Sequence, residues 1–329
     1  MNRPFDVVVN TIVDRLTDYL DKSGMYYRIF SRAKSIPSLQ KKLERNPQKY
    51  SADGKKIQDL IGIRVVFYFQ EDVSIFHDKL KQMDGYDPKN ESNSSKDLEE
   101  LTEWIDAWGD DRKEDKERLG KLLPFNETVF MPERLNVVMQ LNEEEKELVD
   151  QELGLKEGLD PSLIDGTYEV QLRTVLSEGW HEVEHDLRYK MKGEPWWSYC
   201  KDESRMLNGI YASLETSERA LSQMIDGVAY KNYKNKDWDA MLRFHFRRRI
   251  SENKLTKELC DVLNADDRIA KQILQVTRHD LTQWLWLIDK PFTLTTTLLL
   301  HIINRKLLHN AQITELETNP IKLILDGVI

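Results

Sequence analysis

Three short β-rich segments, each set off by helical or polar sequence, constrain the fold of this chain more than any other feature. They are IGIRVVFYF at 61–69, RLNVVMQL at 134–141 and TYEVQLRT at 167–174. Strands that alternate with helices in this way form a sheet that is covered by helices. The first 200 residues therefore read as an α/β or α+β domain.

Helical patterns surround these strands. Apolar residues recur every four positions near the start of the chain, and Ser35 with Pro37 two residues later is typical of a helix start. Helices are predicted at 4–22, from Ser35 onward, at 73–83, at 142–155, from Leu176 onward and at 203–227.

The chain divides into two predicted domains. Residues 1–228 hold the strands and carry a polar, strongly charged insertion at about 86–121. Residues 229–329 read as all-helical, with Asp237 as a cap and breaks near Asn264 and Pro291. The apolar segment PFTLTTTLLLHIINRK is too short and too rich in threonine to span a bilayer, so a buried helix is expected there.

Composition excludes several classes of protein. The chain has 329 residues, of which 32% are charged and 40% hydrophobic, as in a soluble globular protein. Its net charge of −9 argues against coating nucleic acid but allows a local basic pocket. Cys200 and Cys260 form no disulfide framework, and Asp6 interrupts the first apolar run, so no secretion signal is predicted. A cytoplasmic location is expected.

The sequence HEVEH, 181–185, fits the zinc-binding pattern H-E-x-x-H. His181 and His185 lie one helical turn apart, and Glu182 would activate a bound water. A third ligand is missing where longer forms of this motif have it. The alternative is a surface role for His181 and a hydrogen bond for His185.

The helix that carries this motif has an apolar stripe. Leu176, Trp180, Val183 and Leu187 follow helical spacing and predict the buried face. Both histidines would then point away from the core.

The strand before that helix has one polar face. Glu169, Gln171 and Arg173 alternate onto it, whereas Val170 and Leu172 share the other face. Three polar side chains on a central strand are costly unless that face opens onto a site. This row predicts an active site, and a half-exposed strand is the alternative.

The longer stretch EVQLRTVLSEGWHEVEHDLRYK, 169–190, resembles the signature of RelA/SpoT-type nucleotide pyrophosphokinases, the alarmone synthetases. That family has E-[IV]-Q-[IL]-R-T on a strand and W-x-x-[IVL]-E-H-x-[IL]-x-Y-K on the next helix. RAKSIPSLQKKLER, 32–45, resembles the family's ATP block. QDLIGIRVVFYF, 58–69, resembles its D-[IL]-x-G-[IV]-R-[IV] strand. In this comparison Glu184 and His185 belong to the family pattern, and only His181 completes the zinc look-alike.

The resemblance implies a nucleotidyltransferase-like mixed sheet flanked by helices and a Mg²⁺-dependent reaction with ATP. The β,γ-pyrophosphate of ATP would move to a ribose hydroxyl and AMP would leave, a transfer that rests on positioning and positive charge. Asp59 and Glu169 would hold Mg²⁺, because magnesium prefers carboxylate oxygens. Glu169 would also help to deprotonate the hydroxyl, and Gln171 joins them as a catalytic candidate.

The ATP-binding candidates are cationic or polar. The basic side chains of 32–45 gather at the start of a helix, which favours anions, and Ser38 and Lys42 share one helix face. A solvated basic face is the alternative. The resemblance implies that Arg32 and Arg64 sandwich the adenine, which suits a flat guanidinium; a structural salt bridge is the alternative for Arg64. The predicted ATP-binding residues are Arg32, Lys34, Ser38, Lys42 and Arg64.

The acceptor half departs from the family pattern. Guanosine-specific members carry G-Y-x-S-x-H before the penultimate strand, but Pro132 stands at the tyrosine place and Asn136 at the histidine place. Proline has no aromatic face, and asparagine carries no proton near neutral pH. The lysine-rich segment of the family is replaced by an acidic one at 98–117. Asn136 and Arg173 remain as acceptor-side candidates.

Three functions stay open for such a chain. It could use GDP or GTP as an alarmone synthetase of the stringent response. It could use an adenosine nucleotide or the 3′ end of a tRNA, as toxin-like relatives of toxin–antitoxin systems do. It could also be a catalytically weak nucleotide sensor, and a zinc peptidase is a further rival.

The helical region offers two partner hypotheses. WDAMLRFHFRRRI, 238–250, mixes arginines with phenylalanines, which can bind RNA, or its arginines complete a helix end and pair with acidic groups. The C-terminal helices could also form a homo-oligomer or bind a regulatory partner, and QWLWLIDK at 283–290 reads as core or interface.

Overall fold

A computed structural model describes residues 5–45, 50, 56–58, 60–88, 135–154, 160–189, 201–252 and 254–327. Much of the predicted insertion at 86–121 lies outside these residues. The described chain forms two compact units. One contains residues up to Asp14 together with Tyr27–Glu218, and the other contains Arg15–Tyr26 together with Arg219 onward. The predicted domain boundary at residue 228 stays a prediction.

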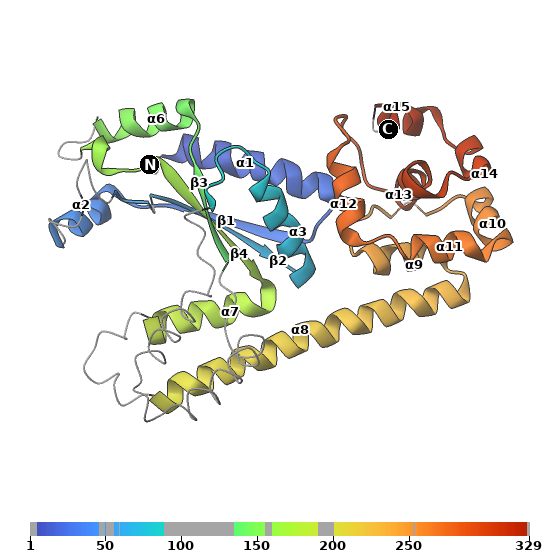
Figure 1. The fold of residues 1–329 in the computed structure, drawn as a ribbon, viewed down its shortest axis with the longest axis horizontal. Coiled ribbons are helices and arrows are strands. Elements are labelled where there is room, and N and C mark those ends of the chain that lie inside the picture. Colours follow the sequence, from blue (N-terminus) through green and yellow to red (C-terminus); the bar gives the residue numbers. More distant parts are fainter. Residues whose placement is uncertain are drawn as a thin grey trace, which may run out of the picture. The chain divides into compact units, whose positions relative to one another are not determined.

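The first unit is built on a mixed four-stranded sheet, which confirms the predicted fold class of a sheet flanked by helices (Figure 1). The order is β1-β2-β4-β3, with β1 and β3 antiparallel to their neighbours and β2 parallel to β4. The strands are β1 Tyr27–Ala33, β2 Ile61–Phe67, β3 Leu135–Gln140 and β4 Thr167–Thr174.

The sheet has one apolar face, covered by a helix. The alternate residues Ile61, Ile63, Val65 and Phe67 of β2 are fully buried, and α3 packs against β2 and β4 on this side. The rings of Phe67 and Phe76 lie with centroids 5.6 Å apart. Burying each such side chain contributes about 1.5–3 kcal/mol, so this face anchors the sheet and leaves the other face to the site.

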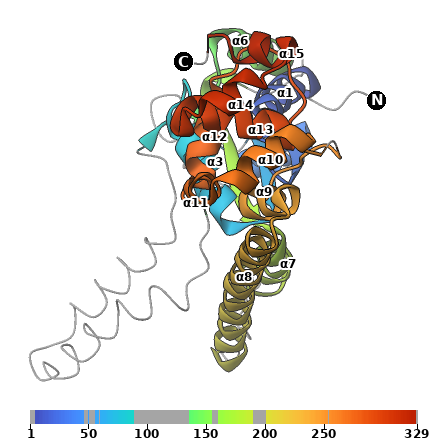
Figure 2. The same cartoon turned by 90° about the vertical axis from the view of Figure 1, so that its right-hand side faces the viewer.

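The helices of this unit follow the predictions closely. They are α2 Ile36–Arg45, α3 Gln70–Lys81, α6 Glu143–Gly154 and α7 Val175–Glu184, with a π-helical turn at His185–Tyr189. Helices α1 Asp6–Ser23 and α8 Lys201–Asn235 each contribute to both units. Figure 2 shows α8 as one continuous helix, which extends beyond the predicted end at residue 227. None of the described helices is long and apolar enough to cross a membrane.

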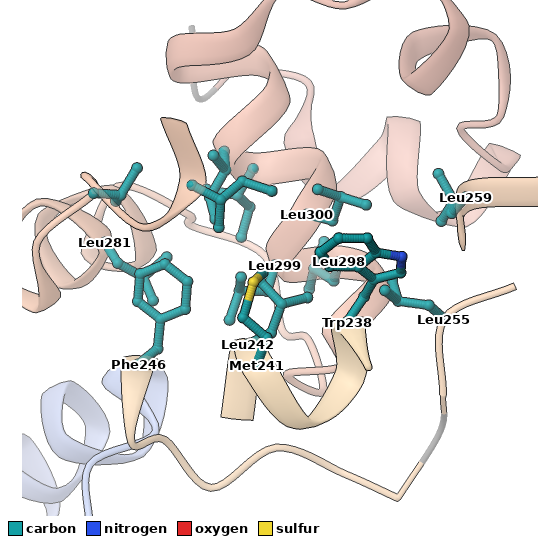
Figure 3. Close-up of a cluster of buried hydrophobic side chains, with 14 of the residues drawn as sticks. Trp238, Met241, Leu242, Phe246, Leu255, Leu259, Leu281, Leu298, Leu299 and Leu300 are labelled. Atoms are coloured by element: carbon teal, nitrogen blue, oxygen red, sulfur yellow. The ribbon is translucent and has the colours of Figure 1, made fainter. Parts of the chain in front are cut away.

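The second unit is helical, as predicted, and has its own core. Trp238, Met241 and Phe246 of one helix meet Leu298 and Leu299 of another (Figure 3). Asp237 caps the first of these helices as predicted, because its side chain accepts a hydrogen bond from the Ala240 amide. The helices are α9 Trp238–Phe246, α10 Lys257–Ala265, α11 Asp267–Ile273, α12 Arg278–Trp286, α13 Thr296–Ile303, α14 Ala311–Glu315 and α15 Asn319–Leu325.

The segment Arg15–Tyr26 belongs to this helical unit. The Trp286 indole donates to the Tyr19 carbonyl at 2.9 Å, and the Arg249 amide donates to the Gly24 carbonyl at 2.7 Å. Gly24 has φ +65, and a Cβ there would lie 2.9 Å from Leu294 Cδ2. Glycine fits because it adopts positive φ at no steric cost.

Candidate active site

The register of the sheet brings the predicted site residues to the face opposite α3. Arg32 on β1 pairs with Gly62 on β2, and Gly62 pairs with Glu169 on β4. One step along the strands, Arg64 pairs with Gln171. Since side chains alternate along strands, these four side chains all lie on the face that β2 leaves polar.

A pocket of about 390 Å³ opens on this face. That volume lies within the range of about 300–1,000 Å³ that is usual for small-molecule sites. The Arg32 side chain lies over Gly62 of β2, where a Cβ would be in ordinary van der Waals contact with Arg32 Nε at 3.6 Å. The lining residues are Phe30, Ser31 and Arg32 of β1, Gly62, Ile63 and Arg64 of β2, Gln171 of β4, and Glu178 and Glu182 of α7.

Hydrogen bonds in the plane of its guanidinium hold the Arg64 side chain in place. Its Nε donates to Gln171 Oε1 at 3.0 Å, and its Nη1 donates to Glu178 Oε1 at 2.6 Å and to Glu182. Burial lowers the pKa of Arg64, but the hydrogen bonds and charges of Glu182 and Glu178 outweigh it and raise the pKa. Because these bonds lie in the plane, the flat faces of the group stay suited to stacking.

Gln171 joins this arginine to the central carboxylate. Its Oε1 accepts from Arg64, so its Nε2 is the donor, and Nε2 lies 3.0 Å from Glu169 Oε2. Glu169 therefore has a fixed position on the open face and offers the hard oxygen that magnesium prefers. Asp59, the other predicted metal ligand, lies outside the described residues.

The acceptor-side candidates share the same face. Asn136 on β3 pairs with Gln171, and its side-chain oxygen accepts from Arg173 Nη2 at 3.0 Å. Arg173 is buried and also donates to the Leu172 carbonyl at 2.8 Å. Arg173 therefore holds Asn136, which is half-buried on β3, on the far side of β4 from Arg64.

The remaining ATP-binding candidates do not line the pocket. Lys34 follows β1, with its amide bonded to the Leu60 carbonyl at 2.9 Å, and Ser38 is exposed on α2. The Lys42 ammonium lies 5.5 Å from the centroid of the Tyr50 ring. These three residues follow Arg32 along the chain, after the part of β1 that lines the pocket.

The two histidines of HEVEH lie in different environments, and the predicted helix face was wrong. His181 is buried, with its ring centroid 5.1 Å from Trp180 and 6.0 Å from Tyr211. His185 is exposed, and its Nδ1 lies 3.2 Å from Asp186 Oδ1. Within the described ranges, no three metal-binding side chains group together.

The expected core stripe of this helix is exposed. Leu176, Val183 and Leu187 are 37%, 46% and 58% exposed, whereas Trp180 is buried as predicted. The helix lies on the polar face of the sheet, so polar side chains with partners point inward.

The arginines of 238–250 serve the helical unit. Arg247 and Arg248 are buried; the first pairs with Asp226, and the second donates to Thr282 at 2.8 Å. Arg243 donates to the Ile250 carbonyl at 2.9 Å. These three guanidinium groups are therefore committed inside the unit, as the helix-end interpretation expected.

Sequence reasoning missed β1 and the roles of Phe30 and Glu178 in the pocket. Phe30 is 54% exposed on β1. The alternation in YRIFSRA was an available signal for this strand. Glu182 was considered only as part of a zinc motif. Glu178 carried no local signal, because its partner Arg64 lies 114 residues away.

Comparisons with known proteins point to one family. A family model described as the region found in RelA / SpoT proteins matches residues 31–103. No curated protein sequence matches the chain. The crystal structure of small alarmone synthetase 1 from Bacillus subtilis is 17% identical with a TM-score of 0.38, over 67% of this chain and 92% of that one. A GTP pyrophosphokinase family protein from Streptococcus pneumoniae is 17% identical with a TM-score of 0.38, over 67% and 89%.

Proposed function

We propose, from the premise that residues 31–103 carry the region found in RelA/SpoT proteins, that this chain is an ATP-dependent pyrophosphokinase. It moves the β,γ-pyrophosphate of ATP to a ribose hydroxyl and releases AMP. The observation that supports this best is the polar sheet face, with the Arg64 pocket on one side of Glu169 and Asn136 on the other.

The donor side binds ATP by stacking and by charge. Arg32 and Arg64 present flat guanidinium groups to the adenine, and Arg64 is already fixed by its in-plane bonds. The triphosphate extends toward Lys34, Ser38 and Lys42, which follow Arg32 along the chain and supply cations and a hydroxyl.

The centre of the face carries the transfer. A hydroxyl oxygen of the acceptor forms the new bond to the β-phosphorus, the bond from that phosphorus to the oxygen bridging to the α-phosphate breaks, and AMP keeps that oxygen. Glu169 accepts the hydroxyl proton and, with Asp59, is the ligand set for magnesium. Bound magnesium would neutralise the charge that develops on the phosphates. Asn136 orients the acceptor through its amide.

Transfer of label from γ-labelled ATP tests this function. The protein with Mg²⁺ is incubated with GDP, GTP, ADP, ATP or tRNA, and labelled product and AMP are measured together. Equal amounts of AMP and labelled product are expected with at least one acceptor, which also identifies that acceptor. Binding of ATP without transfer to any of them would contradict the enzyme and leave a nucleotide sensor.

Glu169→Gln is the matching variant. Loss of the proton acceptor is expected to lower the transfer rate by about 10²–10⁴-fold. Glu144→Gln, at an exposed position of α6, is the same chemical change away from the site and should transfer at the wild-type rate. Equal rates for Glu169→Gln and the wild type would remove Glu169 from the reaction.

A further inference from the structure

The pocket is nearly balanced in charge, which distinguishes it from a phosphate site. Arg32 and Arg64 contribute two positive charges, and Glu178 and Glu182 contribute two carboxylates. Phe30 and the bare backbone at Gly62 complete the walls. A triphosphate would be repelled by the carboxylates, whereas a flat, uncharged heterocycle fits aromatic and guanidinium surfaces.

Glu178, which lines the pocket, has one carboxylate oxygen in use and one that is buried and unpaired within the described chain. Its Oε1 accepts from Arg64 Nη1 at 2.6 Å. Its Oε2 is buried and has no hydrogen-bond partner among the residues that the structure describes. A buried acceptor without a donor is costly, so a ligand that brings a donor to this oxygen gains more than one that does not.

Glu182 differs in this respect. Its carboxylate pairs with the same Nη1 of Arg64, but its side chain is 60% exposed, so water can satisfy its oxygens. Both glutamates thus hold Arg64, and of the two Glu178 is the one with a buried acceptor that lacks a partner among the described residues.

We infer that Glu178 selects the base of the donor nucleotide by accepting a hydrogen bond from an exocyclic amino group, as in a 6-aminopurine. This inference rests on the proposed function and names the residue that sets its donor specificity. A 6-oxopurine has a carbonyl oxygen at that position, which would face the carboxylate as a second acceptor. Guanine presents two adjacent donors, N1–H and its 2-amino group, which would need both oxygens of a carboxylate, and here Arg64 occupies one of them.

Direct binding to the full chain, without acceptor, tests the inference apart from catalysis. Dissociation constants are measured by calorimetry for ATP, for the triphosphate of unsubstituted purine riboside and for ITP. ATP is expected to bind most tightly. The unsubstituted purine, which lacks one hydrogen bond to a charged group, should bind about tenfold to a hundredfold more weakly, and ITP most weakly of all. Equal constants for the three nucleotides would overturn the inference.

Glu178→Gln and Glu182→Gln form a matched pair. In Glu178→Gln the side-chain oxygen can still accept from Arg64 while the NH₂ group donates, so the preference for ATP over ITP should fall at least tenfold or reverse. In Glu182→Gln all three nucleotides should shift by a common factor. An unchanged ATP/ITP ratio in Glu178→Gln would overturn the inference, and so would a similar ratio change in both variants.

The failures of the two proposals are distinguishable. If the wild type binds none of the three nucleotides, the proposed function falls. If it binds ATP and transfers pyrophosphate without discriminating against ITP, only the role of Glu178 falls. The ligand series on the wild type needs no variant, so a misfolded Glu178→Gln protein would not prevent the decision.

Discussion

At the scale of single residues, the site depends on one amide. Gln171 accepts from Arg64 with its oxygen and donates to Glu169 with its nitrogen. No charged side chain can do both, because a carboxylate only accepts and an ammonium only donates. Gln171 therefore links Arg64, which is proposed to hold the base, to Glu169, which is proposed to hold the metal.

Gln171→Leu should break this link. The variant keeps a similar volume but leaves Arg64 Nε and Glu169 Oε2 without their partner. Loss of hydrogen bonds to charged groups should lower kcat/KM for pyrophosphate transfer about tenfold to a hundredfold. Gln275→Leu, at an exposed position of the helical unit, is the control and should match the wild type. A Gln171→Leu enzyme with wild-type kcat/KM would show that the link has no part in the reaction.

At the scale of elements, the sequence predicted β2, β3, β4 and most helices, but it missed β1 and indicated the wrong buried face of α7. Apolar spacing on α7 indicated the wrong buried face, since the helix rests on polar groups of β2 and β4. There Glu178 points inward and pairs with Arg64, whereas Val183 is exposed. Strand β1 has an exposed Phe30 because it is an edge strand, and so it showed no apolar run.

A capping box fixes the start of α7. Loss of this capping box should lower both the stability of the protein and its affinity for ATP. The Thr174 hydroxyl accepts from the Ser177 amide at 3.1 Å, the Ser177 hydroxyl accepts from the Thr174 amide at 3.0 Å, and Thr174 also bonds Glu218. Thr174→Ala should lower stability by about 0.5–2 kcal/mol. Because Glu178 lies in the first turn of α7, ATP affinity should fall as well.

Urea unfolding and ATP titration of the same samples check this. Thr216→Ala is the matched control: that threonine is also helical, but its hydroxyl only bonds the Ala212 carbonyl at an exposed position. Thr216→Ala should change the free energy of unfolding by no more than about 0.5 kcal/mol. A Thr174→Ala protein as stable as Thr216→Ala would show that the box does not hold α7.

At the scale of the whole molecule, the sequence indicated a helical C-terminal region, but it did not show that a segment near the start of the chain belongs to the same unit. No local pattern could show that Arg15–Tyr26 belongs with it, because the partners lie more than 200 residues away. The buried polar groups of that unit were equally hidden. His301 is fully buried, and neither ring nitrogen has a hydrogen-bond partner within the described chain.

His301 should make the stability of the helical unit depend on pH. Burial lowers its pKa and so does Arg305, while Glu317 opposes them. The unfolded chain therefore binds a proton more readily, and stability is full above the unfolded pKa of about 6.5 and falls as pH drops below it. The slope can reach about 1.4 kcal/mol per pH unit for one histidine.

Unfolding midpoints between pH 7.5 and pH 5.5 measure this slope. His301→Leu should flatten it, and the part that remains belongs to His245, whose pKa burial also lowers. The exposed His279 provides the control His279→Leu, which should keep the wild-type slope. If the slope of His301→Leu equals that of the wild type, the buried ring is not the source.

The place of Arg15–Tyr26 in the helical unit also has a consequence during synthesis. Tyr19 and its partner Trp286 are 267 residues apart. At about 5–20 residues per second, the first waits on the ribosome for roughly 15–50 s before the second exists. The hydrogen bond between them cannot form during that interval. Residues 15–26 therefore join their unit late, after most of the chain has been made.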